Sequence, residues 1–377
     1  MKKNLLIDAL STSGGGAASH LQNLLDNFGR QTFFKKVVVY LPKKMIRLMP
    51  KNNNIDYKYI PFGLDYFLFF RLFYQIFVLN FIIFFFNKFN CIFVTGGSHV
   101  ILNKNVVTIS QNLLPFVDKE VKRYSKTFFF LKLKILKFTQ TLAFKLSSGI
   151  IFLHKYSQKI ILNQLGETRH RTTIIPHGVK KRVKSIVNDY KKFRIIYVSN
   201  IDIYKNHDFV IKSIDLFLDR YPIFQSRLTI EFYGSKFKPA YKIFQNYLNL
   251  SKYKKNYKYF GVKKHNFIYT NKKKKNNIFL FASSCENFSV SLIEGMSYGL
   301  PIICNNLQPM KSVLKNSSVF FKYNNSESFV DKMFYLLSNF ELRKKLSSKG
   351  YYNSKLYDHK RIALQTYKFL KHNSDQS

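Results

Sequence analysis

The stretch CENFSVSLIEGMSYGLP, residues 285–301, decides the fold of the second half of the chain. It follows the apolar run IFLFA at 278–282, which predicts a buried strand, and it continues as a polar loop and an amphipathic helical pattern. Ser289 is suited to begin the helix as its N-cap, and Gly299 is suited to end it. A second apolar run then follows, so the stretch reads as strand, loop, helix and strand. The N-terminus of such a helix is a natural site for an anion.

Two glutamates, Glu286 and Glu294, stand eight positions apart in this stretch. Acids are scarce here, because the 377 residues contain 20 Asp and Glu against 62 Lys and Arg, a formal net charge of +42. Wholly helical spacing would separate the two glutamates by about 12 Å of rise. They could therefore hold opposite ends of one extended ligand, but they could not grip one atom together.

The rest of the chain repeats the alternation of strand and helix. This pattern favours parallel sheets covered by helices on both faces, and it predicts two Rossmann-like lobes joined near residues 180–190. The strand-like runs are Asn4–Leu10, Lys36–Leu41, Cys91–Thr95, Val106–Ile109, Ile150–Leu153 and Thr173–Ile175 in the first half, and Phe193–Val198, Leu228–Tyr233, Ile278–Phe281 and Pro301–Cys304 in the second.

Composition limits the class of protein and its partners. With 46% hydrophobic and 22% charged residues, the chain has enough apolar side chains for folded cores. Its positive charge would attract nucleic acid, anionic lipid or phosphorylated small molecules. The three cysteines lack metal-ligand spacing, so neither a disulfide framework nor a zinc site is indicated, and a reducing cytoplasm fits best. The N-terminal run is interrupted at Asp8 and leads into glycines, which indicates a first strand and not a signal peptide.

Two segments raise the question of a membrane. Residues 65–86 are long and apolar enough to span a bilayer. Arg71, Gln75 and Asn80 within the segment, and the strand that follows at once, favour a buried or membrane-surface helix over a spanning one.

Residues 119–145 interleave lysines with Phe and Leu, which is typical of a helix on an anionic interface. A helix that packs on its lobe and exposes solvated lysines is an equal alternative. Nucleic acid ranks below lipid as a partner, because no nucleic-acid-binding motif accompanies the segment.

The whole string at 285–301 resembles the hallmark of a known family, the retaining, nucleotide-sugar-dependent glycosyltransferases of family 4, also called glycosyltransferase group 1. Their motif has two glutamates separated by seven residues in a setting much like this one. The resemblance extends in order along most of the chain. The matching places are the GGG loop at 14–16, SQNLLPF at 110–116, IIPHGV at 174–179, YVSNIDIYKNH at 197–207, FYGS at 232–235 and FGV at 260–262.

This resemblance implies an α/β fold of the GT-B type, with two facing Rossmann-like domains and mostly parallel sheets. The N-terminal domain, residues 1–180, would bind the acceptor, and the C-terminal domain, residues 181–360, would bind the nucleotide sugar. Residues 361–377 would form a C-terminal tail or helix that can pack back on the N-terminal domain.

The resemblance also implies roles for residues of the donor site. Glu286 would contact the donor sugar near the reacting carbon, and the backbone N–H groups of Asn287, Phe288 and Ser289 would line the sugar and phosphate. Glu294 would accept hydrogen bonds from the ribose hydroxyls, which suit a carboxylate with two acceptor oxygens.

Further residues complete this expected site. Lys205 matches the family's lysine that neutralises the leaving diphosphate. Asn200, Gly234 and Gly261 match donor-binding places in the three strand-end motifs of the second half. In the family an arginine usually stands where this chain has Asn200, so Lys205, the glycine-loop amides and the helix dipole would bear more of the charge.

The glycines Gly14, Gly15 and Gly16 would let the first loop approach phosphate and acceptor closely. Asn112 or Gln111 would take the acceptor-side place where many relatives have histidine, and we assign no general base.

From the resemblance and the composition together, we expect a retaining glycosyltransferase that needs no metal or other cofactor, with UDP and GDP donors both open. Its acceptor would be a glycan or a lipid-linked glycan in the synthesis of a bacterial surface polysaccharide or lipopolysaccharide. It would lie on the inner face of the cytoplasmic membrane as a peripheral protein, without nucleic acid as a partner. The alternatives are a two-lobe nucleotide-sugar-binding or scaffolding protein without turnover, and a membrane-anchored protein of the same pathway.

Overall fold

The computed structural model describes residues 3–12, 14–61, 70, 73–86, 89–166, 170–269 and 276–375. They belong to two compact units. The first unit comprises Met1–Val121, Phe129–Gly178 and Asp358–Ser377, and the second comprises Lys122–Phe128 and Val179–Tyr357. The main boundary between the two units lies between residues 178 and 179, whereas the sequence predicted it between 180 and 181. The short segment Lys122–Phe128 lies with the second unit, although its sequence position had placed it within the predicted first domain.

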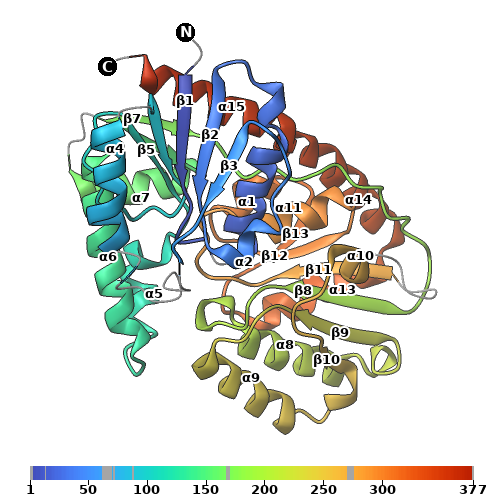
Figure 1. The fold of residues 1–377 in the computed structure, drawn as a ribbon. Coiled ribbons are helices and arrows are strands. Elements are labelled where there is room, and N and C mark those ends of the chain that lie inside the picture. The colour runs from blue at the N-terminus through green and yellow to red at the C-terminus, as the bar shows by residue number, and fades with distance from the viewer. Residues whose placement is uncertain are drawn as a thin grey trace. The chain divides into compact units, whose positions relative to one another are not determined.

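The first unit is built on a parallel sheet, which has seven strands among the residues described (Figure 1). Strand β1 pairs with both β2 and β4, so the chain runs first to one edge of the sheet and then to the other. In sheet order, the strands are β3 (Ile55–Lys58), β2 (Phe34–Tyr40), β1 (Lys3–Asp8), β4 (Cys91–Val94), β5 (Val106–Ser110), β6 (Gly149–Phe152) and β7 (Arg171–Ile174).

The helices of the first unit connect these strands and cover the sheet. The C-terminal helix α15 returns to this unit, where the Tyr367 hydroxyl donates to the Leu24 carbonyl of α1 at 2.9 Å and Lys3 pairs with Asp375 at 2.6 Å. The helices are α1 (Gly15–Asp26), α2 (Lys43–Ile46), the π-helix η3 (Tyr74–Leu79), α4 (Asn80–Phe86), α5 (Asp118–Lys122), α6 (Phe129–Leu146), α7 (Lys155–Leu165) and α15 (His359–Ser374), with short 3-10 turns at Phe28–Arg30 and Leu114–Phe116.

The second unit has the same plan, with a parallel sheet of six described strands. Strand β8 pairs with β9 and β11, which repeats the double winding of the first sheet. In sheet order, the strands are β10 (Tyr257–Tyr259), β9 (Leu228–Tyr233), β8 (Phe193–Val198), β11 (Asn276–Phe281), β12 (Ile302–Asn305) and β13 (Ser318–Phe321). The central strands β8, β11 and β12 are mostly apolar and almost wholly buried, as is usual for parallel strands covered on both faces.

The helices of the second unit include the one predicted from residues 285–301, which is α11. They are η5 (Ile203–Lys205), α8 (His207–Arg220), α9 (Lys238–Leu250), α10 (His265–Tyr269), α11 (Val290–Ser297), α12 (Met310–Leu314), α13 (Ser326–Ser338) and α14 (Phe340–Ser354), with short 3-10 turns at Pro222–Phe224, Lys254–Asn256 and Lys355–Tyr357.

Three strands were missed in the sequence, namely β3, β10 and β13. Each is the outermost strand of its sheet at one edge. Edge strands have only one neighbour and are partly exposed, so their sequences, IDYK, YKY and SVFF, mix polar and apolar residues. The apolar runs that reveal a central strand are absent from such segments.

The apolar segment predicted at 65–86 lies partly outside the described residues, because 65–69, 71 and 72 are not among them. Its described part, η3 and α4, packs on the first sheet through buried Leu79 and Ile83. Its two polar residues are bound within the unit, since Gln75 donates to Asp8 at 2.6 Å and Asn80 donates to the Val100 carbonyl at 2.8 Å. Among the residues the structure describes, none of the helices combines the length and apolarity needed to cross a bilayer.

Candidate nucleotide-sugar site

The loop and helix at the carboxyl end of β11 take the form that the sequence predicts. Helix α11 begins at Val290, and the Ser289 side chain caps it by accepting from the Leu292 N–H at 3.4 Å. The helix lies close against β11, because a Cβ on Gly295 would come within 2.9 Å of the Phe279 ring. Glycine is therefore required for this approach of α11 to the sheet.

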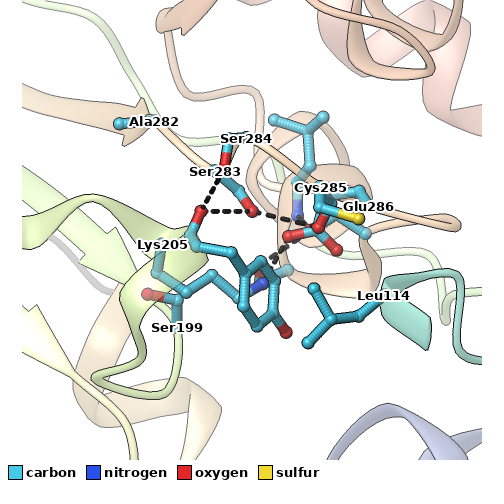
Figure 2. Close-up of polar contacts among 12 residues, drawn as sticks. Leu114, Ser199, Lys205, Ala282, Ser283, Ser284, Cys285 and Glu286 are labelled. Atoms are coloured by element: carbon cyan, nitrogen blue, oxygen red, sulfur yellow. Dashed lines mark hydrogen bonds and ion pairs between the residues drawn. The ribbon is translucent and has the colours of Figure 1, made fainter. Parts of the chain in front are cut away.

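Lys205 and Glu286 form an ion pair at the centre of this site, and Figure 2 shows the two side chains meeting. Lys205 ends the 3-10 turn η5 after β8, and Glu286 lies in the loop after β11, which is the neighbouring strand. Each side chain is 11% exposed. Burial by itself would lower the pKa of Lys205, but the Glu286 carboxylate beside it raises the pKa above the ordinary value. The lysine therefore stays protonated in a nearly dry environment.

Hydrogen bonds hold the two loops of this pair together. The Ser284 N–H donates to the Tyr204 carbonyl at 2.8 Å, and the Ser283 and Ser284 hydroxyls also lie within hydrogen-bond distance of that oxygen (Figure 2). The Tyr197 hydroxyl, from β8, donates to the Lys205 carbonyl at 2.5 Å. The backbone on both sides of the ion pair is consequently fixed by the sheet beneath it.

The residues that follow Glu286 lead into α11. Asn287 and Phe288 are 5% and 6% exposed, and the Phe288 ring lies 5.4 Å from the ring of Tyr357. Asn287, Phe288 and Ser289 occupy the loop and cap positions from which backbone N–H groups at a helix N-terminus bind anions. Their expected contacts with sugar and phosphate stay predictions.

Glu294 lies in the middle of α11 and has its own partners. Its carboxylate accepts from the Tyr269 hydroxyl at 3.3 Å, and the His265 Nδ1 lies 3.3 Å from its other oxygen. Burial raises the pKa of Glu294 to about 7, although Arg182 and the Tyr269 hydrogen bond act in the opposite direction. Because Glu286 pairs with Lys205, the two glutamates serve separate clusters, as their spacing predicts.

Asn200, Gly234 and Gly261 come together beyond the carboxyl ends of β8, β9 and β10. The side-chain oxygen Oδ1 of Asn200 accepts from the backbone N–H of Ser235 at 3.3 Å and from the Ser235 hydroxyl at 2.8 Å. Gly234 N–H donates to the Gly261 carbonyl at 3.0 Å. Gly234 has a φ of 146°, and a Cβ there would lie 2.0 Å from the Ser199 carbonyl oxygen. This close crossing of two loops excludes any residue larger than glycine.

The acceptor-side residues of the prediction belong to the first unit. Gly14 and Gly15 have φ values of 148° and 61°, and α1 begins at Gly15, with Gly16 inside its first turn. A Cβ at Gly14 or Gly15 would meet no atom within 4 Å, so backbone conformation and not crowding favours glycine there. Asn112 accepts from the Leu114 N–H at 3.1 Å in a local turn.

Several side chains around Glu294 were not found in the sequence. They are Tyr269 and His265 from α10, Tyr298 at the end of α11, and Arg182, whose guanidinium lies 5.6 Å from the centre of the Tyr298 ring. Tyr269 and Tyr298 stack at 4.5 Å between ring centres. No local pattern marks these residues, because they meet only when α10, α11 and the segment before β8 pack together.

Comparisons with known proteins bear on both the fold and the family. Residues 179–352, most of the second unit and a little under half of the chain, match the family model described as glycosyl transferases group 1. No curated protein sequence matches the chain.

Solved structures match over nearly the whole length. A sucrose-phosphate synthase from Thermosynechococcus elongatus is 12% identical with a TM-score of 0.77, covering 100% of both chains. Anabaena HepE in complex with UDP is 13% identical with a TM-score of 0.70, covering 99% of this chain and 100% of its own. WaaG, a glycosyltransferase involved in lipopolysaccharide biosynthesis, is 10% identical with a TM-score of 0.69, covering 97% and 99%. The chain therefore has the GT-B fold, and most of its second unit, including Lys205, Glu286 and Glu294, lies within the region that matches the model of glycosyl transferases group 1.

Proposed function

We propose that this protein is a retaining glycosyltransferase that moves a sugar from a nucleotide-sugar donor to a glycan or lipid-linked acceptor. The observation that carries the proposal is the buried pair of Lys205 and Glu286 beside the capped N-terminus of α11. A buried ammonium and a helix N-terminus are both suited to bind a diphosphate, and both lie within the region that matches the group 1 family. Structures of the similar HepE contain UDP and UDP-glucose, so uridine nucleotides are the first donors to test.

In the proposed reaction, the bond between the anomeric carbon and the diphosphate oxygen breaks, and its electron pair stays on that oxygen. The acceptor hydroxyl bonds to the same face of the carbon, and its proton passes to the leaving phosphate oxygen. Lys205 stabilises the charge that grows on the diphosphate. Glu286 orients the sugar, and Glu294 accepts from the ribose hydroxyls. No residue acts as a general base in this front-face route, and no metal or other cofactor is required.

Incubation of the purified protein with a panel of UDP and GDP sugars tests this proposal. We expect hydrolysis or transfer with at least one donor, retention of the anomeric configuration in the product, and activity that survives EDTA. The variant Glu286→Ala should lose this turnover. A failure of every donor to react, together with nucleotide affinity that is the same in Glu286→Ala and the wild type, would contradict the enzyme proposal.

The alternative is a two-lobe protein that binds a nucleotide sugar, or serves as a scaffold, without turnover. It is favoured by Asn200, since the amide oxygen at this place is already bound by Ser235 and supplies no positive charge. Nucleotide binding without turnover, abolished by Lys205→Ala, would support this second function.

We also propose that the first unit docks on an anionic membrane surface, at the inner face of the cytoplasmic membrane. Such docking would be required if the acceptor is a lipid-linked glycan in the synthesis of a surface polysaccharide or lipopolysaccharide. Helix α6 has two apolar stripes. One is buried and contains Leu133 and Ala143. The other is exposed and has a helical spacing; it consists of Leu131, Ile135, Phe138 and Leu142, which are 52%, 53%, 70% and 38% exposed.

A second set of exposed aromatic residues lies on η3 and α4. Phe77, Phe81, Phe84 and Phe85 are 59%, 54%, 79% and 65% exposed. The loop at 98–102 joins the two elements, since Asn80 of α4 donates to the Val100 carbonyl and the hydroxyls of Ser98 and of Thr139 in α6 lie 3.4 Å apart. Figure 1 shows α4 and α6 on the same side of the first unit. Lysines at 132, 134, 137 and 145 lie along α6, so the face combines apolar and basic side chains, as an anionic interface requires.

Co-sedimentation with lipid vesicles tests this surface. We expect binding to vesicles that contain phosphatidylglycerol and much weaker binding to pure phosphatidylcholine. The double variant Phe84→Ser/Phe138→Ser should reduce binding, whereas Leu250→Ser is the matched control, because Leu250 is 74% exposed but lies on α9 of the second unit. Equal binding of the double variant and the control would contradict the assignment. Carbonate extraction should release the protein from membranes, and retention in the pellet would instead favour a membrane-anchored protein.

A further inference from the structure

We propose that Arg123 is a positioning residue that clamps together the two loops carrying Lys205 and Glu286. The inference rests on the proposed function for its consequence, but the clamp itself is a property of the fold. Arg123 belongs to Lys122–Phe128, the short segment that lies with the second unit although both of its sequence neighbours belong to the first.

The guanidinium of Arg123 bridges the two loops directly. One nitrogen, Nη1, donates to the Ser284 hydroxyl at 2.9 Å, two residues before Glu286. The other, Nη2, donates to the Ile203 carbonyl at 2.9 Å and to the Asn206 side-chain oxygen at 2.8 Å, on either side of Lys205. The Arg123 side chain thus binds both the loop that carries Lys205 and the loop that carries Glu286.

Asn206 extends the clamp across the same gap. It has a φ of 54°, a left-handed conformation that asparagine tolerates better than most residues. Its side-chain nitrogen donates to the Ala282 carbonyl at 2.8 Å, so the chain of contacts runs from Arg123 through Asn206 to the end of β11. The Asn206 amide therefore accepts from Arg123 through its oxygen and donates to Ala282 through its nitrogen, which requires a side chain with both an acceptor and a donor.

The neighbouring Tyr124 anchors the segment. Tyr124 is fully buried, and its hydroxyl donates to Asp202 at 2.7 Å. Asp202 in turn caps the turn η5 by accepting from the Ile203 N–H at 2.7 Å. Arg123 and Tyr124 together therefore bind both ends of the turn that presents Lys205.

The chemistry of arginine suits this role. Its planar fork offers several N–H donors in fixed directions, whereas a lysine ammonium is a point charge that cannot hold three acceptors in one plane. Lys205 can stabilise a leaving group only when its ammonium stays where negative charge develops, and displacements of about 1 Å in a catalytic group can cost about 100-fold in rate. Arg123 is thus expected to act on turnover through Lys205 and Glu286, without contact with the donor.

The native Cys285 reports on the clamp without any assay of activity. It lies between Ser284 and Glu286 and is 6% exposed, whereas Cys91 and Cys304 are fully buried within strands β4 and β12. We expect Arg123→Gln to raise the rate of Cys285 alkylation by iodoacetamide about tenfold, the effect of losing roughly one hydrogen bond to a charged group on local opening. Alkylation of Cys91 and Cys304, measured by mass spectrometry on the same samples, should not change.

Arg220→Gln is the matched control, because Arg220 is also in the second unit but its ion pair with Glu327 is on the surface. It should leave Cys285 as protected as in the wild type. Equal alkylation rates in Arg123→Gln and the wild type would overturn the proposal, as would a parallel rise at all three cysteines, which indicates global unfolding.

Kinetics separate the clamp from the proposed function. With an active donor, Arg123→Lys and Arg123→Ala should lower kcat about 10 to 100-fold with little change in the donor KM, and guanidinium ion should partly restore Arg123→Ala. Where Lys205→Ala does lower kcat, wild-type kcat in Arg123→Lys and Arg123→Ala would also overturn the proposal. One outcome would support the clamp alone: Arg123→Gln exposes Cys285, but neither Arg123→Gln nor Lys205→Ala changes turnover or nucleotide affinity. In that case the clamp stands and the proposed function fails. If only Lys205→Ala has an effect, the function stands and the clamp fails.

Discussion

The ammonium of Lys205 donates to the carboxylate of Glu286, and both groups are almost removed from solvent. The two residues lie 81 positions apart in the sequence, but they follow neighbouring parallel strands, β8 and β11, whose carboxyl ends meet at one edge of the sheet. An ion pair in this environment is costly to break from one side, because the remaining charge stays buried.

We expect Lys205→Ala to lower turnover by about 100 to 1,000-fold, the usual effect of losing one group that stabilises developing negative charge. Steady-state kinetics with the donor found in the screen would measure this loss. The control is Lys252→Ala, because Lys252 is 65% exposed in the same unit. Turnover in Lys205→Ala that matches the control would remove Lys205 from the site.

The pKa of Glu294, raised by burial to about 7 from 4.5, predicts how stability depends on pH. Between these values the folded state binds a proton that the unfolded state has released, so the free energy of unfolding falls as pH rises from about 5 to 7. A rise of this size corresponds to about 3 kcal/mol of stability. Urea denaturation of the wild type and Glu294→Gln across this range measures it, and the variant should lack this contribution.

The same group predicts an opposite trend for ligand binding. His265, Tyr269, Tyr298 and Arg182 surround the carboxylate, and burial lowers the pKa of His265, so this histidine is neutral at pH 7. In the proposed function Glu294 accepts from two ribose hydroxyls, and the ionised carboxylate, which carries acceptors only, suits this better than the protonated form. Nucleotide affinity in calorimetry should therefore rise as pH rises through about 7, and Glu294→Gln should show a flat profile over that step.

Gly234→Ala tests the close crossing of the loops after β8 and β9. The added Cβ would lie 2.0 Å from the Ser199 carbonyl oxygen, at a φ that alanine rarely adopts. Backbone strain alone should lower the free energy of unfolding by about 1–3 kcal/mol. Gly29→Ala is the control, because a Cβ there would meet no atom within 4 Å and its φ is not positive. Chemical denaturation that ranks the two variants equally would contradict the crowding at Gly234.

Arg194 and Glu231 form a fully buried network in the second sheet. Arg194 donates to Glu231 at 2.6 Å and to the Tyr233 hydroxyl at 2.8 Å. Arg194→Met should lower the free energy of unfolding by about 3–5 kcal/mol, because it leaves a buried carboxylate uncompensated. The double variant Arg194→Met/Glu231→Leu should recover much of this loss. Thermal and urea unfolding provide the comparison, and a double variant less stable than Arg194→Met would show that the charge is not the cause.

The central strands and the glutamate-bearing helix could be predicted because their signals are local. Strands β8 and β9 have the predicted bounds, and the Ser289 cap and the Gly299 stop lie where the pattern expects them. The three missed strands, β3, β10 and β13, had no such signal, since each lies at an edge and lacks a neighbouring strand on one side. The sequence also did not predict that the segment Lys122–Phe128 lies with the second unit. Its basic and aromatic residues have no local pattern that distinguishes a surface helix from a segment that contacts the loops carrying Lys205 and Glu286.

By itself, the sequence determined the alternation of strands and helices, the central strands of the parallel sheets, and the place of the motif that contains Glu286 and Glu294. It did so because hydrophobic period, caps and glycines act over a few residues. Only the tertiary structure decided that Lys205 meets Glu286, that Tyr269 meets Glu294, and that Arg123 bridges Ser284 and Asn206. Those contacts join residues that are distant or separated in the chain. Lys205 meets Glu286 because parallel strands bring their carboxyl ends, and the loops that follow, to one edge of a sheet. The contacts of Tyr269 and Arg123 depend instead on how α10 and the segment Lys122–Phe128 pack against α11 and these loops.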